Sequence, residues 1–173
     1  MKEIIRYGLI LALICAIATG LLAGVNFLTK PKIMAQEQNE QENSLREVMP
    51  EGRDFEAVES DGEIIYYKIY DKDKKLMGFA FQAQTKGYSS DIVTMVGMTM
   101  DGEITAIKVL SQNETPGLGA RIAEPAFTGQ FSHKNIQGIS EVQAITGATI
   151  SSKAVIDSVK KKAQEIKALI NSR

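Results

Sequence analysis

The segment Ile145-Thr146-Gly147-Ala148-Thr149-Ile150-Ser151-Ser152 stands immediately before the last long amphipathic stretch of the chain. Its small residues Gly147 and Ala148 leave the Thr149 hydroxyl with little steric cover. Either serine can cap the helix that follows, because a serine oxygen accepts a hydrogen bond from an early backbone N–H. The positive end of that helix would face Thr149 and stabilise an anion there. The segment therefore predicts an exposed hydroxyl beside a phosphate site, and a plain loop-to-helix junction is the alternative.

Residues 152–170 carry an apolar stripe at helical spacing, formed by Val155, Val159, Ala163, Ile166 and Ile170. This spacing predicts an amphipathic helix whose stripe packs on a sheet. The other side is rich in lysine, at Lys160, Lys161, Lys162 and Lys167. A solvated face is the simplest interpretation of these lysines, and a membrane-surface role is the less favoured one.

Four β-rich segments, 64–70, 76–84, 91–100 and 103–110, precede this helix. The charged run 71–75 joins the first two, and Asp101-Gly102 is a strong turn signal between the last two. The pattern predicts two hairpins in one antiparallel sheet. A short helix is expected over residues 122–131, interrupted at Pro125. Sheet and helices together predict an α+β domain of roughly 120 residues, large enough to bury a core.

Residues 7–29 form a run of 23 residues without a charge. As a helix this run would be about 35 Å long, enough to cross a hydrocarbon core of about 30 Å. We expect one transmembrane helix that ends at Pro31. A cleaved signal peptide is the alternative, with Ala16-Ile17-Ala18 as its cleavage site, but the apolar run continues past that point. Basic residues flank both ends almost equally, so they do not fix the orientation.

Three parts are therefore expected: a transmembrane anchor over residues 1–32, a polar stalk or linker over 33–51, and a folded domain over 52–173. The middle part is rich in Gln, Glu and Asn and lacks Gly and Pro until Pro50. This composition favours a helical stalk, with a disordered linker as the alternative.

Composition excludes several kinds of site. The net charge of -1 and the pI of about 5.9 argue against a nucleic-acid partner. The chain has one cysteine, Cys15, and one histidine, His133, so we expect no disulfide framework and no metal centre. A redox function would therefore depend on an organic cofactor or on a partner.

The Thr-Gly-Ala-Thr run resembles the flavinylation motif of the FMN-binding domain family, which reads Ser/Thr-Gly-Ala-Thr/Ser. The resemblance implies that FMN is joined through a phosphoester bond to the last hydroxyl, here Thr149. It also implies contacts from the neighbouring residues Thr146, Gly147, Ala148, Ser151, Ser152 and Lys153. One departure is Gln143, which stands six residues before Thr149, where the family often has an aspartate.

The run Glu114-Thr115-Pro116-Gly117-Leu118-Gly119 resembles a second loop of the same family, which lines the flavin site. Pro116-Gly117 also fits a type II turn with no further role. A flavin ring is flat and largely apolar with polar edges. The resemblance therefore suggests that Gly117 and Gly119 allow close approach, Leu118 covers a ring face, and Glu114 and Thr115 meet the polar edges. Lys86-Gly87-Tyr88 also matches the family's sheet.

Within this family, the chain is similar to the G subunits of Rnf-type ion-translocating electron transport complexes. That resemblance implies a flavin domain outside the cell membrane, other membrane subunits as partners, a flavin transferase for maturation, and electron transfer between ferredoxin and NAD coupled to ion movement. No catalytic triad and no NAD-binding Gly-x-Gly-x-x-Gly motif is present, so the chain would carry electrons without being catalytic alone. The alternatives are a C-type subunit of a sodium-translocating NADH:quinone reductase, a tethered binding or sensing module without covalent flavin, and a pilin-type filament subunit.

Overall fold

The computed structural model describes residues 2–60 and 62–171. Met1, Asp61, Ser172 and Arg173, which fall in the predicted ranges 1–32 and 52–173, lie outside the described residues. The chain divides into two units, Met1–Glu42 and Asn43–Arg173.

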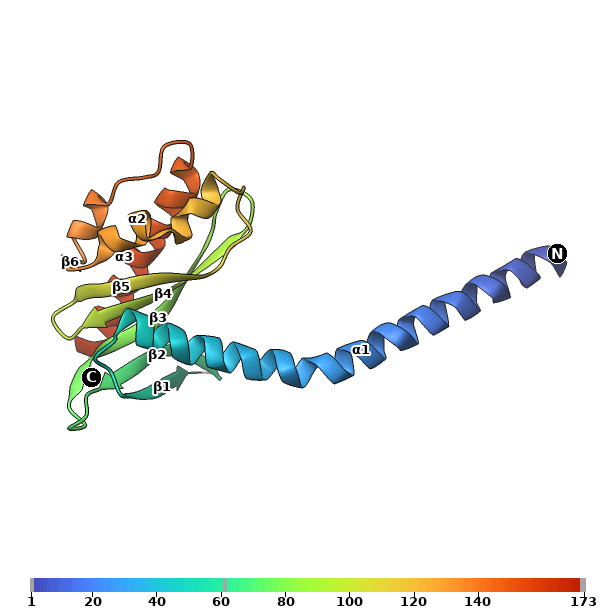
Figure 1. The fold of residues 1–173 in the computed structure, drawn as a ribbon, viewed down its shortest axis with the longest axis horizontal. Coiled ribbons are helices and arrows are strands. Elements are labelled where there is room, and N and C mark those ends of the chain that lie inside the picture. Colours follow the sequence, from blue (N-terminus) through green and yellow to red (C-terminus); the bar gives the residue numbers. More distant parts are fainter. Residues whose placement is uncertain (1, 61, 172–173) are drawn as a thin grey trace. The chain divides into compact units, whose positions relative to one another are not determined.

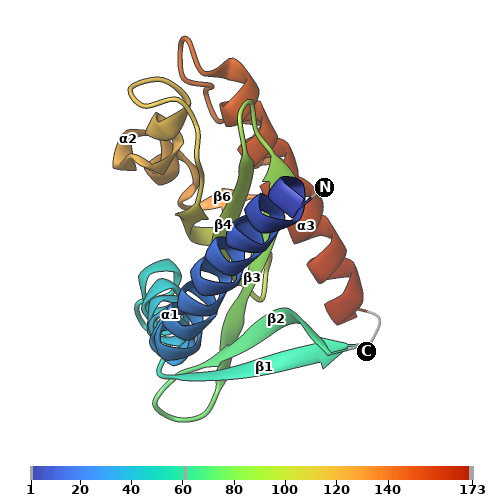
Figure 2. The ribbon, with the colours of Figure 1, turned by 90° about the vertical axis from the view of Figure 1, so that its right-hand side faces the viewer.

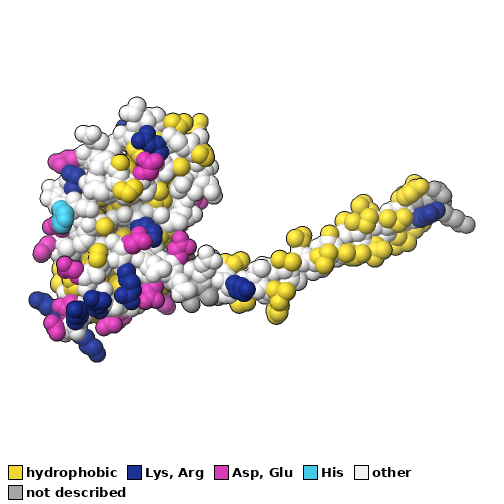
Figure 3. All heavy atoms as spheres, viewed as in Figure 1, with side chains coloured by type: hydrophobic (Ala, Val, Ile, Leu, Met, Phe, Trp, Pro, Cys, Tyr) yellow, Lys and Arg dark blue, Asp and Glu magenta, His cyan; other side chains and the backbone are white. Residues whose placement is uncertain are grey.

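The first unit is helical throughout its described residues and belongs to α1 (Lys2–Val48). Its segment Ile4–Ile33 has a mean hydropathy of 2.5 and no buried residues, and it is long and apolar enough to span a membrane. Large hydrophobic side chains are exposed along this segment, and they cover much of the face of it that Figure 3 shows. The predicted end at Pro31 is wrong, because α1 continues through it. A proline removes one hydrogen bond from a helix interior, and here the polar helix-forming residues that follow continue the helix past that loss.

The second unit contains one antiparallel sheet with its strands in sequence order (Figures 1 and 2). The two predicted hairpins are confirmed, as β2 (Glu63–Tyr70) with β3 (Leu76–Lys86), and β4 (Asp91–Thr99) with β5 (Glu103–Ser111). Two edge strands were missed, β1 (Asp54–Ser60) and β6 (Lys134–Asn135). β1 is acidic and no residue in it is fully buried, and β6 has two residues, so neither carries an apolar alternation that a sequence reading could detect.

Alternating residues of the strands face two separate cores. Tyr66, Phe79 and Phe81 belong to the larger core, whereas their neighbours Tyr67 and Ala80 belong to the smaller one. This alternation follows from the two-residue period of a strand. The sheet is therefore covered on both faces.

The larger core lies under α3 (Thr149–Asn171), which packs on β3 and β4. The predicted stripe is confirmed: Val155, Val159, Ala163 and Ile166 are buried and Ile170 packs at the edge of the core. Four short helices complete this layer: η1 (Gly119–Ala123), α2 (Pro125–Thr128), η2 (Gly129–Phe131) and η3 (Gly138–Glu141). The first three replace the single interrupted helix expected over 122–131, because Pro125 starts a new helix and Gly129 ends it.

The smaller core lies under the last turn of α1. Leu45, Val48 and Met49 are buried there against the sheet. The Thr105 hydroxyl donates a hydrogen bond to the Val48 carbonyl (2.5 Å), and Lys108 Nζ lies 2.8 Å from Glu47 Oε1. The compact unit therefore begins at Asn43, before the predicted start of the domain at residue 52.

Candidate functional site

Thr149 is the first residue of α3 and is exposed. The loop before it turns at Gly147, where φ is +81°, a conformation that favours glycine. Ala148 is buried and its carbonyl accepts the Ser152 N–H at 3.0 Å, which is the first hydrogen bond of the helix. These features hold the Thr149 hydroxyl at a fixed, accessible helix start.

The predicted capping by Ser151 or Ser152 is wrong, because the helix begins before both residues. The Ser152 hydroxyl donates to the Ala148 carbonyl (2.8 Å) and accepts the Ile145 N–H (3.1 Å). It therefore fastens the loop to the first turn of the helix. Both serines are buried, so their hydroxyls support the site from inside the protein.

Glu114 is the buried centre of the site, with an exposed fraction of 5%. Its Oε1 accepts hydrogen bonds from the N–H groups of Ser89 (2.9 Å) and Ser90 (3.0 Å). Its Oε2 accepts the Ser151 hydroxyl (2.6 Å) and the Tyr88 N–H (3.3 Å). One carboxylate therefore joins the β3–β4 turn, the 114–119 loop and the start of α3.

The same contacts set the charge state of Glu114. Burial by itself raises the pKa of the carboxyl, but the hydrogen bonds from Ser151 and from the backbone of Ser89, Ser90 and Tyr88 together outweigh it. The pKa of Glu114 consequently lies below its usual value. Glu114 is therefore a buried carboxylate anion whose oxygens accept hydrogen bonds from the protein's own donors.

The two predicted motifs meet at Leu118, Gly119 and Gly147. A β carbon on Gly147 would lie 3.3 Å from Leu118 Cδ2, so this leucine lies over the loop that leads to Thr149. A β carbon on Gly119 would lie 2.8 Å from Glu114 Oε2 and 2.9 Å from Ser151 Oγ. Only glycine fits at position 119 without displacing that network.

Around Thr149 the surface is mixed in character. Thr115, Pro116, Gly117, Thr146 and Lys153 are exposed. Three large apolar side chains are exposed as well: Tyr88 (68%), Leu118 (48%) and Ile150 (58%). Tyr88 and Ile150 were not predicted as site residues, although each adjoins a predicted motif. An exposed apolar side chain cannot be recognised from sequence alone, because its neighbours decide whether it is covered.

A pocket of about 250 Å³ opens beside this loop. Its apolar wall includes Phe127, Ala144 and Ile145, and its polar rim includes Arg121 and Thr146. Gln143, the residue that departs from the usual aspartate, also lines it. Sequence reasoning did not predict this pocket, because it forms between η1, α2 and a loop about 20 residues further along the chain.

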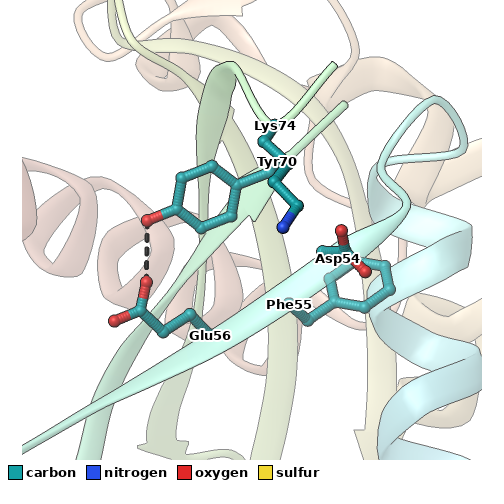
Figure 4. A pocket seen from close by; sticks show the side chains of 5 residues that line it. All are labelled: Asp54, Phe55, Glu56, Tyr70 and Lys74. Carbon is teal, nitrogen blue, oxygen red and sulfur yellow. Dashed lines mark hydrogen bonds between the residues drawn. The ribbon is translucent and has the colours of Figure 1, made fainter. Parts of the chain in front are cut away.

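A second pocket, of about 230 Å³, lies at β1 and the end of β2 and contains none of the predicted site residues (Figure 4). Asp54, Phe55, Glu56, Tyr70 and Lys74 line it. The Tyr70 hydroxyl donates to Glu56 Oε2 at 2.7 Å, and this hydrogen bond is the main reason that the pKa of Tyr70 is raised.

Comparison with known proteins matches residues 87–164 to the FMN-binding domain family and residues 1–48 to the RnfG N-terminal region. The chain is 34% identical to the G subunit of the Na(+)-translocating ferredoxin:NAD(+) oxidoreductase complex of Acetobacterium woodii, over 91% of this chain and 89% of that protein. The chain belongs to the RnfG family. A second member, the G subunit of the ion-translocating oxidoreductase complex of Methanosarcina acetivorans, is 33% identical over 91% of this chain and 92% of that protein.

The RnfG fold also resembles a solved structure, the C subunit of the Na(+)-translocating NADH-quinone reductase of Parabacteroides distasonis. The TM-score is 0.51 with 22% identity, over 64% of this chain and 70% of that chain. This likeness concerns the fold alone. As an RnfG family member, the chain carries an FMN-binding domain and one N-terminal helix able to span a membrane.

The residues around Thr149 fit the flavin phosphate that this family assignment implies. The N–H groups of Thr149, Ile150 and Ser151 precede the first helical hydrogen bond and find no acceptor within the described parts of the chain. Unpaired N–H groups at a helix start bind anions. The exposed apolar side chains of Leu118 and Ile150 offer contact area for a flat ring.

Proposed function

We propose that this chain is the membrane-anchored flavin subunit of an Rnf-type complex, with FMN bound covalently to Thr149. In the attached form the Thr149 oxygen is bonded to the flavin phosphorus in place of one phosphate oxygen; that P–O bond is broken and the hydroxyl proton is lost, so relative to free FMN the chain gains one FMN less one water. When bound, the flavin supplies the redox chemistry, and the chain itself needs no general acid, base or nucleophile. The observation that carries the proposal is the meeting of both motifs at an exposed threonine that begins α3.

The start of α3 is suited to hold the product. A phosphodiester keeps one negative charge, which the unpaired N–H groups of Thr149, Ile150 and Ser151 stabilise together with the helix dipole. Lys153, exposed one turn into the helix, adds a positive charge on the same side. Ser151 and Ser152 act indirectly, by fixing this turn to Glu114 and to the loop.

Glu114 has a different role from the one its position in the motif first suggests. Because its oxygens accept five hydrogen bonds from the protein, Glu114 supports the site from inside the protein and leaves the polar edges of the ring to exposed groups such as Thr115. Gly119 allows this buried carboxylate to approach α3.

The family assignment supports the wider setting of the proposal. The A. woodii relative is named as part of a complex that couples ferredoxin and NAD(+) chemistry to Na(+) translocation. We assign to this chain a single-electron relay between other membrane subunits of such a complex. Residues 1–32 would anchor it, 33–42 would act as a stalk, and the compact unit from Asn43 on would carry the flavin on the external side of the cell membrane, where a tether prevents loss of the cofactor.

The test is flavin attachment during co-expression with a flavin transferase. After denaturing electrophoresis, flavin fluorescence should remain on the parent chain and on a Thr149→Ser variant, which keeps the hydroxyl. It should be absent from Thr149→Ala. Ser60→Ala serves as the control and should keep the fluorescence, because it removes an exposed hydroxyl outside both motifs. Fluorescence on Thr149→Ala equal to that of the parent would contradict the assigned site.

A further inference from the structure

We propose that the pocket lined by Arg121, Gln143 and Thr146 seats the polar edge of the flavin ring, with the Arg121 guanidinium facing the ring carbonyls. This inference rests on the proposed attachment at Thr149. It assigns a seat for the ring to residues outside both sequence motifs, except for Thr146.

The position of the pocket is within reach of the tether. Thr146 lies three residues before Thr149, so their Cα atoms are at most roughly 11 Å apart. The opposite wall is also connected to the flavin loop, because the Arg121 N–H donates to the Leu118 carbonyl at 3.2 Å. The pocket therefore lies between the two segments that the proposed function brings to the flavin.

The residues that line the pocket match both the apolar face and the hydrogen-bonding edge of a flavin ring. Phe127 and Ile145 provide apolar contact for the ring face. Gln143 has a side-chain amide without a partner among the described residues, and Thr146 is exposed, so both are available to the ring's hydrogen-bonding edge. Gln130, by contrast, already accepts the Gln143 N–H (2.9 Å) and donates to the Ala126 carbonyl (3.1 Å).

Arg121 supplies the charge complementarity. Its Nε lies 3.4 Å from Oε2 of Glu124, which also lines the pocket; because both side chains are about half exposed, this surface ion pair is weak. The guanidinium has further N–H donors that can meet ring carbonyls. If the ring were bound here, the positive charge of Arg121 would stabilise negative charge on the ring and would therefore raise its reduction potential.

The experiment uses the full flavinylated chain in detergent micelles and measures the midpoint potential by dithionite titration. Arg121→Gln should lower the potential and change the ratio of oxidised to reduced flavin at a fixed potential by about fivefold, the effect of one charge at about 4 Å in water. Arg53→Gln is the control, because Arg53 is exposed and lies outside this pocket. It should leave the potential unchanged.

A second variant tests the position of the ring by filling the pocket with a larger side chain. Ala144→Phe would fill the pocket, so the flavin fluorescence should become more accessible to quenching by iodide than in the parent. The pocket assignment alone would be overturned if covalent attachment were normal, Arg121→Gln left the midpoint potential unchanged, and Ala144→Phe left the iodide quenching unchanged. Absence of covalent flavin from the parent would overturn the proposed function and the pocket assignment with it.

Discussion

Replacing Glu114 with alanine should destabilise the folded unit more than any comparable change of an exposed acidic residue. Glu114 accepts hydrogen bonds from Ser151, Ser89, Ser90 and Tyr88 at 2.6 to 3.5 Å. Its removal leaves these donors without their acceptor and opens a void under Gly119.

The magnitude follows from the burial of these donors. A hydrogen bond to a charged group contributes about 1.5–3 kcal/mol, but such contributions do not add. Ser89 and Tyr88 lie on an exposed turn, where water can replace the lost acceptor, whereas Ser151 is buried. We therefore expect a loss of about 3 kcal/mol in the free energy of unfolding, and a fall in Tm of about 10 °C.

The assay is guanidinium unfolding of the full chain in detergent, followed by near-ultraviolet circular dichroism of the tyrosines. The matched control is Glu141→Ala, which removes an exposed carboxylate paired with Lys134 at 3.1 Å. Such a surface pair contributes about 0–1 kcal/mol. If Glu114→Ala were no less stable than Glu141→Ala, the assignment of Glu114 as the centre of the site would be refuted.

Three further changes test the account. On acidification, the stability that Glu114 contributes should be lost as the pH falls below the usual glutamate pKa of about 4.3 and through its lowered pKa in the folded state. In acid titrations, the free energy of unfolding should therefore fall less steeply with decreasing pH for Glu114→Gln than for the parent. Gly119→Ala should lower the free energy of unfolding by about 1–3 kcal/mol, because the added β carbon meets the Glu114 network. In the same unfolding assay Gly129→Ala should change it little, because a β carbon there has no atom within 4 Å and the φ of -64° suits alanine. In urea titrations, Ile166→Ala should lower the free energy of unfolding by about 2–5 kcal/mol, because this side chain is fully buried in the larger core. Leu169→Ala should lower it by only about 0.5 kcal/mol, because Leu169 is 45% exposed on the same helix.

Much of the fold could be predicted because its signals are local. The charged turn at 71–75 and Asp101-Gly102 each separate two β-rich segments, so both hairpins followed from short-range chemistry. The stripe from Val155 to Ile170 repeats at the helical period, so the face of α3 that packs on the sheet also followed. β1 and β6 lacked such signals, because an edge strand buries little and needs no apolar alternation.

The site could be predicted in outline and not in its internal contacts. The two motifs indicated which segments meet. The role of Glu114 depends on the β3–β4 turn about 25 residues earlier and on Ser151 37 residues later, and no spacing rule predicts that convergence. The serines illustrate the same limit: a Ser-Ser pair before an apolar stripe favours a cap, but the Ser151 hydroxyl donates to the distant Glu114 and the Ser152 hydroxyl bonds to the backbone of the preceding loop.

The most direct test of the central claim is the intact mass of the full chain after co-expression with a flavin transferase, followed by mapping of the modified peptide. The account predicts a gain of one FMN less one water on the parent chain, located at Thr149 and absent from Thr149→Ala. An unmodified parent, under conditions in which an established acceptor protein is modified, would contradict covalent attachment and the flavin relay that depends on it.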